Sequence, residues 1–76
     1  MNYTIASLRT HGGEFVMDFG KDGNKYSISI HDRQSGVIRT RLFQNVNEAA
    51  WKFSELAKWC CTGSYSFEDR RKFLFE

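Results

Sequence analysis

The chain has 76 residues, of which 41% are hydrophobic, 16% aromatic and 26% charged. This length suits a single domain spanning residues 1–76, and the composition excludes a disordered or collagen-like chain. Eleven Lys and Arg residues against nine Asp and Glu residues leave a net charge of +2. The strong basic excess of a dedicated nucleic-acid module and the strong acidic excess of a DNA mimic are both missing, so the net charge does not select a partner.

The two cysteines of the chain, Cys60 and Cys61, are adjacent. Neighbouring residues on a helix point about 100° apart, so these thiols form neither an ordinary disulfide nor a zinc ligand set. We therefore expect no metal, no other cofactor and a reduced, cytoplasmic setting. Residues 1–10 lack the apolar run of a signal peptide, and no stretch approaches the roughly 20 apolar residues of a membrane span, so we expect a soluble protein with no membrane partner.

Glycine, asparagine and aspartate residues divide the first half of the chain, and proline is absent. The turn signals are Gly12–Gly13, Asp22–Asn24 and Gln34–Gly36, and the strands expected between them are Tyr3–Arg9, Glu14–Phe19, Lys25–Asp32 and Val37–Phe43. The Asp-Gly step in the second turn is a strong hairpin signal, because it tolerates the positive φ that primed turns need.

Apolar and polar residues alternate along the last three of these strands. Alternation of period two predicts one dry and one wet face, as in an antiparallel meander covered on one side. The expected dry face carries Phe15, Met17, Phe19, Tyr26, Ile28, Ile30, Ile38, Thr40 and Leu42. The expected wet face carries Glu14, Val16, Asp18, Lys25, Ser27, Ser29, His31, Arg39 and Arg41.

Residues 46–61 change to helical spacing, with one apolar stripe that suits a lid over the dry face. Asn45 or Asn47 can cap the start of this helix, and Gly63 follows its end. The segment from Ser66 to Phe75 predicts a short second helix or a packed arm. The expected fold is α+β: a three- or four-stranded antiparallel meander packed on one long helix, with this C-terminal element beside it.

The cysteine, histidine and carboxylate residues of the chain are not spaced as catalytic groups would need to be. Cys60–Cys61 lie at the negative end of the expected helix, where a thiolate is disfavoured. His31 and Asp32 are adjacent on a strand and point to opposite faces, so Asp32 cannot orient His31. Glu14 and Asp18 would need a sugar cleft for glycoside chemistry, for which the chain is too small. We expect no enzyme and no small-molecule substrate.

Two groups of residues are candidates for binding a partner. Alternation predicts that Lys25, Ser27, Ser29, His31, Arg39 and Arg41 tile one patch of the wet face. The arginines of this patch suit the carboxylates of a protein or the phosphates of a nucleic acid. The alternative interpretation of the patch is an ordinary solvated sheet face. Trp51 and Trp59 lie outside the centre of the helical stripe and suit a binding hot spot, unless the C-terminal segment covers Trp51.

Part of the chain resembles the three-stranded DNA-binding domains of phage integrases and AP2 factors. Lys25–Ile30, Gly36, Arg39–Phe43 and Asn47–Ala50 correspond to their strands, glycine turn, basic strand and acidic-Ala-Ala helix start. This resemblance implies a small module that lays its sheet face in a DNA groove.

The layout from Val16 to Leu56 also resembles small phage-encoded anti-CRISPR proteins. It combines an Asp-Gly hairpin, a second turn containing glycine, a short basic strand and a helix with Glu and aromatic residues. This resemblance implies a host-defence protein or nucleoprotein complex as the partner. We therefore expect a non-enzymatic phage or mobile-element inhibitor that occupies a partner surface, with the DNA-binding module as the alternative.

Overall fold

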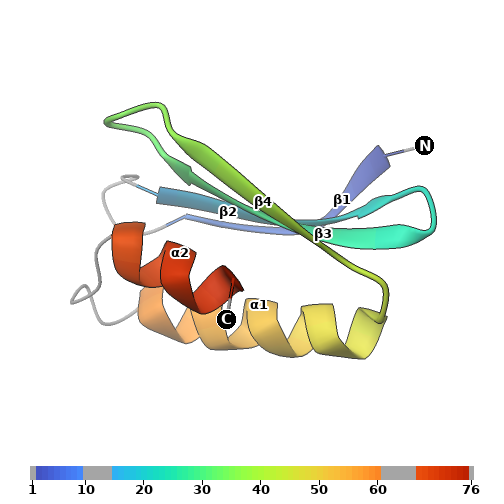
Figure 1. Cartoon of the computed structure of the whole chain (residues 1–76). Helices are drawn as coiled ribbons and strands as arrows, with labels where there is room; N and C mark the ends of the chain where they lie inside the picture. Colours follow the sequence, from blue (N-terminus) through green and yellow to red (C-terminus); the bar gives the residue numbers. More distant parts are fainter. Residues whose placement is uncertain (1, 10–14, 61–66, 76) are drawn as a thin grey trace.

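Four strands and two helices make up the computed structural model, which describes residues 2–9, 15–60 and 67–75. The elements are β1 (Asn2–Arg9), β2 (Phe15–Asp22), β3 (Lys25–Asp32), β4 (Ile38–Phe43), α1 (Val46–Cys60) and α2 (Phe67–Phe75). The strands form one antiparallel sheet in the order β1-β2-β3-β4. Both helices lie on the same face of this sheet (Figure 1). The predicted α+β meander packed on one long helix is confirmed, and the C-terminal element, predicted as a short helix or an arm, is the short helix α2.

The hairpin between β2 and β3 closes tightly. Asp22 pairs with Lys25, so β2 runs three residues beyond its predicted end at Phe19. Gly23 opens the two-residue loop with φ 63, and Asn24 has no positive φ. Positive φ at the first loop position alone is what a type II′ turn requires, and this turn matches the right-handed twist of the strands. Residue 14 and the expected turn at Gly12–Gly13 lie outside the described residues.

The core lies between the sheet and the two helices. Met17, Ile28 and Ile30 enter it from the sheet, while Leu56 of α1 and Leu74 of α2 close it from the other side, all at 0% exposure. Burying a side chain of this size stabilises the fold by about 1.5–3 kcal/mol. These residues therefore hold each helix to the strands.

Asn45 caps α1. Its Oδ1 accepts hydrogen bonds from the backbone N–H groups of Asn47 at 2.8 Å and Glu48 at 3.3 Å. An asparagine at this position satisfies N–H groups that have no partner within the helix. The structure thus selects Asn45 over Asn47, the other candidate from the sequence.

The strand β4 faces the opposite way from the sequence-based prediction. Its register pairs Arg39 with Ile30, Arg41 with Ile28 and Phe43 with Tyr26, so these three β4 residues point toward the helices. Phe43 is buried in the core. Because side chains alternate along a strand, a buried Phe43 brings Arg41 and Arg39 to the same side. The prediction that Ile38, Thr40 and Leu42 lie on the dry face is therefore wrong.

Two cations from other elements cap the C-terminal end of α2. Arg41 Nη1 donates to the carbonyl of Leu74 at 2.7 Å, and Lys52 Nζ donates to the carbonyl of Phe73 at 3.0 Å. The last carbonyls of a helix lack partners within it, and the negative end of the helix dipole favours positive charge. Arg41 and Lys52 thus fasten α2 to β4 and α1.

Replacing Lys52 by methionine tests this cap. Lys52 is buried, and its Nζ also lies 4.2 Å from the ring centroid of Phe73. The Lys52→Met variant keeps the hydrocarbon chain but loses a charged hydrogen bond, so we expect unfolding free energy to fall by about 1.5–3 kcal/mol. Urea denaturation followed by circular dichroism measures this change.

Lys58→Met is the matched control on the same helix. Its exposed ammonium group pairs with Glu55 at 3.1 Å, one turn away, and such surface pairs contribute only about 0.3–0.5 kcal/mol. Equal losses in the two variants would show that Lys52 does not stabilise the end of α2.

Candidate functional site

The sheet face opposite the helices, here called the open face, carries no covering element among the described residues (Figure 1). Strand pairing arranges its side chains in rows that cross all four strands. The three complete rows are Thr4-Gly20-Ser27-Leu42, Ser7-Asp18-Ser29-Thr40 and Arg9-Val16-His31-Ile38. Each row brings together residues that are far apart in the sequence.

Hydrogen bonds organise the middle row. Ser7 Oγ donates to Asp18 Oδ1 at 2.6 Å, and the hydroxyl oxygens of Ser29 and Thr40 are 2.8 Å apart. Cross-strand pairs of this kind fix side-chain positions on a sheet. Within the described part of the chain, Asp18 forms no ion pair, so its negative charge faces the open side.

A hollow of about 320 Å³ lies on this face. Its lining residues are Tyr3, Thr4, Asp18, Gly20, Lys21, Asp22, Ser27, Ser29, Thr40 and Leu42. Asp18 and Asp22 bring two carboxylates to the hollow, whereas the Lys21 Nζ lies 5.6 Å from the ring centroid of Tyr26, the residue that pairs with Lys21 on the helix side of the sheet. The hollow is therefore polar and suits one side chain or a small group of positive charge.

Gly20 keeps the bottom of the hollow open. A Cβ atom on Gly20 would lie 2.7 Å from the backbone oxygen of Tyr3, closer than real contacts allow. The register between β1 and β2 shifts between Thr4 and Ala6, as at a β-bulge. Bulges bend a strand and increase its twist, and here the bent end of β1 comes close to Gly20.

Two apolar side chains of β4 are exposed on the open face, and one of them, Leu42, lines the hollow. Ile38 is 54% exposed and Leu42 is 48% exposed, and both lie on the open face. Large apolar side chains that share one exposed face are typical of a surface that binds another molecule.

The structure separates the patch that the sequence predicts. Lys25, Ser27, Ser29 and His31 lie on the open face, whereas Arg39 and Arg41 lie on the opposite one. The prediction of one continuous patch of six residues is therefore wrong, because β4 is turned by its buried Phe43. Whether any of the six binds a partner stays a prediction.

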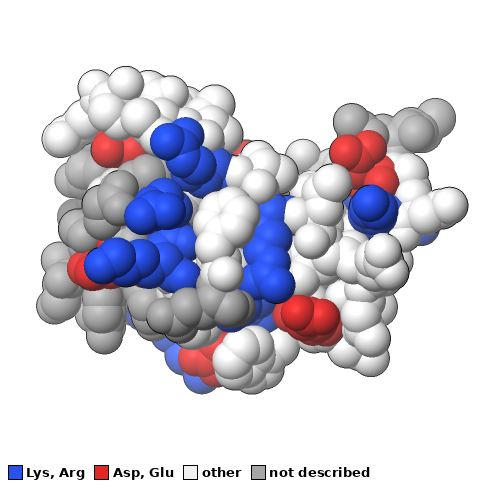
Figure 2. Space-filling view, viewed as in Figure 1, with Lys and Arg blue, Asp and Glu red and all other residues white. Residues whose placement is uncertain are grey.

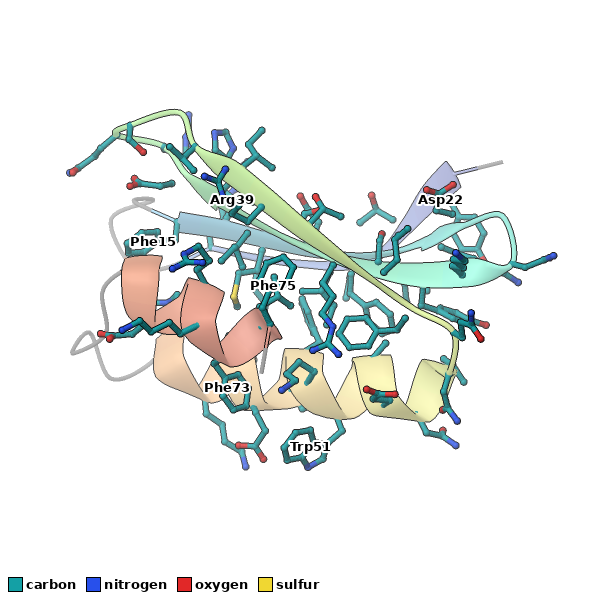
Figure 3. The ribbon with its side chains drawn as sticks, in the orientation of Figure 1. Phe15, Asp22, Arg39, Trp51, Phe73 and Phe75 are labelled. Carbon is teal, nitrogen blue, oxygen red and sulfur yellow. The ribbon has the colours of Figure 1, made fainter. Side chains whose placement is uncertain are left out.

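The tryptophans belong to α1 rather than to the open face. Trp51 is 57% exposed and points away from the sheet (Figure 3). Its ring centroid lies 6.2 Å from that of Phe73, so α2 contacts Trp51 without burying it. The side chain of Trp59 lies outside what the structure describes.

The charge of the open face is balanced. Among the described residues, Arg9 and Lys25 oppose Asp18 and Asp22, so the formal sum is zero (two positive, two negative). Loss of Arg39 and Arg41 from this face removes two of the cations on which DNA binding by the sheet would depend.

Comparisons of the chain with protein-family models, curated proteins and solved structures find no match. Among the described residues, no helix combines the length and apolar character needed to cross a membrane. The same residues contain no group of three or more His, Cys, Asp or Glu side chains that could hold a metal ion. The open face is thus the candidate site on geometry alone.

Proposed function

We propose that the chain is a non-enzymatic binding protein that docks a partner protein on its open face. The observation that carries this proposal is the exposed side chain of Leu42 in the lining of a polar hollow of about 320 Å³, with the exposed Ile38 four residues before it on the same face of β4. Protein interfaces combine an apolar centre with a few well-placed polar groups and a polar rim. The open face supplies apolar side chains on its edge strand β4 and polar groups in its middle row.

The polar groups indicate what the partner presents. Asp18 and Asp22 give the hollow its negative charge, so a Lys or Arg side chain of the partner fits there, held by a charge-assisted hydrogen bond. Apolar residues of the partner would cover Ile38 and Leu42. The balanced charge of the whole face favours this partner over a duplex, whose binding depends on a basic surface.

The double variant Ile38→Asp/Leu42→Asp tests the proposal. Desolvating two carboxylates in an apolar contact opposes docking, so we expect at least a tenfold weaker affinity, or about 1.4 kcal/mol per decade. The immobilised wild-type chain captures partners from an extract of its host, and titration with the purified partner gives the affinity of each variant.

Val46→Asp is the matched control. Val46 is also exposed but lies at the start of α1, away from the open face. A partner whose affinity falls equally with Val46→Asp and with the double variant would contradict docking on the open face. A partner that ignores the double variant would also contradict it.

The class of partner follows from the resemblance to anti-CRISPR proteins and is proposed on that ground. If the partner belongs to a CRISPR-type complex, the wild-type chain will restore phage plating on cells that carry this defence. The double variant will not restore plating, whereas Val46→Asp will. Plating that stays low with the wild-type chain would contradict this assignment and leave open-face docking to the affinity measurement.

A further inference from the structure

Basic side chains gather on the other side of the molecule, over α2 and the adjoining part of the sheet (Figure 2). Counted over their sequences, β4 and α2 together contain five Lys or Arg residues and two Asp or Glu residues, a formal charge of +3. The whole chain carries +2. The net charge of these two short elements therefore exceeds that of the whole protein, and we call their shared surface the β4–α2 surface.

Contacts at both ends of α2 show how this helix is aligned with β4. Arg41 meets Leu74 at 2.7 Å, while the guanidinium of Arg70 lies 4.6 Å from the ring centroid of Phe15. Phe15 pairs with Asp32, at the end of the sheet where β4 begins. The helix thus runs in the same direction as β4.

Arg39 therefore lies beside the middle of α2. It precedes Arg41 by two residues, about 7 Å along a strand, and Arg70 precedes Leu74 by four, about 6 Å along a helix. Figure 3 shows Arg39 on the strand that passes above α2. Its Nη1 donates to the carbonyl of Ile38 at 3.0 Å.

Two exposed cations on this surface are available to a ligand. Arg39 and Lys72 are exposed, and neither forms an ion pair within residues 2–9, 15–60 and 67–75. Lys72 lies three residues before Phe75, so the two share a face of α2. Phe75 is 48% exposed. A cation and an uncovered aromatic ring thus occur side by side.

We propose that the β4–α2 surface binds single-stranded nucleic acid, with Arg39 and Lys72 on phosphates and Phe75 stacked on a base. Carboxylates of an acidic protein would satisfy the cations but leave the ring uncovered. Unpaired bases satisfy both, because every base offers a flat face for stacking while the backbone supplies negative charge. A duplex keeps its bases inside and cannot use Phe75. This site is independent of the open face.

Fluorescence anisotropy with labelled oligothymidylate tests the proposal on the full chain. Affinity should fall steeply as salt increases, because phosphate contacts release counterions. Arg39→Ala/Lys72→Ala should weaken binding at least tenfold and reduce the salt slope by about 1 for each phosphate contact removed. Phe75→Ala should weaken binding by about tenfold, as expected for a lost stacking contact, while leaving the salt slope unchanged.

Lys25→Ala and Lys58→Ala are the matched controls, since they remove a cation from the open face and from the exposed side of α1. Both should leave affinity and salt slope unchanged. Absence of binding at low salt would overturn the proposal, as would equal weakening by Lys25→Ala. A duplex that binds as tightly as the single strand would also overturn it. So would polyglutamate binding that Phe75→Ala does not weaken, since an acidic protein would then be the better partner.

Discussion

We expect Leu74→Ala to lower the free energy of unfolding by about 2–5 kcal/mol. Leu74 is fully buried in the core beneath the sheet, and truncation leaves a cavity lined by neighbours that relax only in part. The same residue also holds α2 in the position where its carbonyl receives Arg41. Small domains have a total stability of about 5–15 kcal/mol, so this loss is a large share of the whole.

Phe75→Ala is the matched control for this prediction. The two positions are neighbours in one helical turn and both become alanine, so differences in helix propensity largely cancel. Phe75 is about half exposed, and we expect a loss below about 1 kcal/mol. Urea denaturation with circular dichroism measures both variants. Equal stability losses would mean that α2 is not anchored through Leu74.

The outcome also bears on nucleic-acid binding by the β4–α2 surface. If Phe75→Ala leaves the fold intact, a loss of oligothymidylate affinity in that variant reports the missing ring rather than an unfolded helix. The Leu74→Ala variant keeps Phe75, so it should bind oligothymidylate as long as α2 stays attached to the sheet. As urea is added, this variant should lose binding at concentrations well below those at which the wild-type chain loses it.

Much of the fold follows from the sequence because its signals are local. The Asp-Gly turn and the alternation on either side of it predict the hairpin, and β3 begins and ends at the predicted residues Lys25 and Asp32. The apolar stripe of α1 predicts a helix over one face, and its members Ala49, Phe53 and Leu56 are buried. Period and turn chemistry were sufficient for these elements.

The facing of β4 could not be predicted in the same way. Its apolar residues Ile38 and Leu42 alternate with arginines, which favours burying the apolar set. The decision instead rests on Phe43, which enters the core beside Tyr26 and sets the phase of the whole strand. The aliphatic part of an arginine can cover apolar surface while its charged end reaches a polar partner. The polar partner of Arg41 is the carbonyl of Leu74 at the end of α2. The sequence around Arg41 does not predict this contact, because the two residues are far apart in the chain.

The middle row of the open face carried a signal in the sequence that alternation alone misses. Ser7, Asp18, Ser29 and Thr40 follow one another at intervals of 11 residues, as their paired positions show. Turns that recur at a constant interval bring such residues together, since each hairpin mirrors the preceding strand. The hollow beside the row depends on the bent end of β1. This bend is a tertiary feature, and the alternation of apolar and polar residues in the sequence does not predict it.

Gly20 of β2 lies against the bent end of β1. We expect Gly20→Ala to destabilise the protein by about 1–3 kcal/mol. The sign is diagnostic, because alanine in an ordinary strand interior is more favourable than glycine by about 0.5–1 kcal/mol. Here the added Cβ would lie 2.7 Å from the backbone oxygen of Tyr3, and a backbone atom cannot turn aside as a side chain does. The end of β1 must therefore move away from β2.

Ser27→Ala separates this contact from a general effect on the hollow. Ser27 pairs with Gly20 and lines the same hollow, but its replacement removes an atom rather than adding one, so we expect a change within about 0.5 kcal/mol. Amide hydrogen exchange then shows which strand is affected. In Gly20→Ala, exchange should accelerate along β1 beyond what the loss of global stability explains, while the amides of β3 and β4 should still exchange only through global unfolding. A more stable Gly20→Ala variant would mean that β1 does not approach Gly20 closely, and the hollow would then lose the wall that Tyr3 provides.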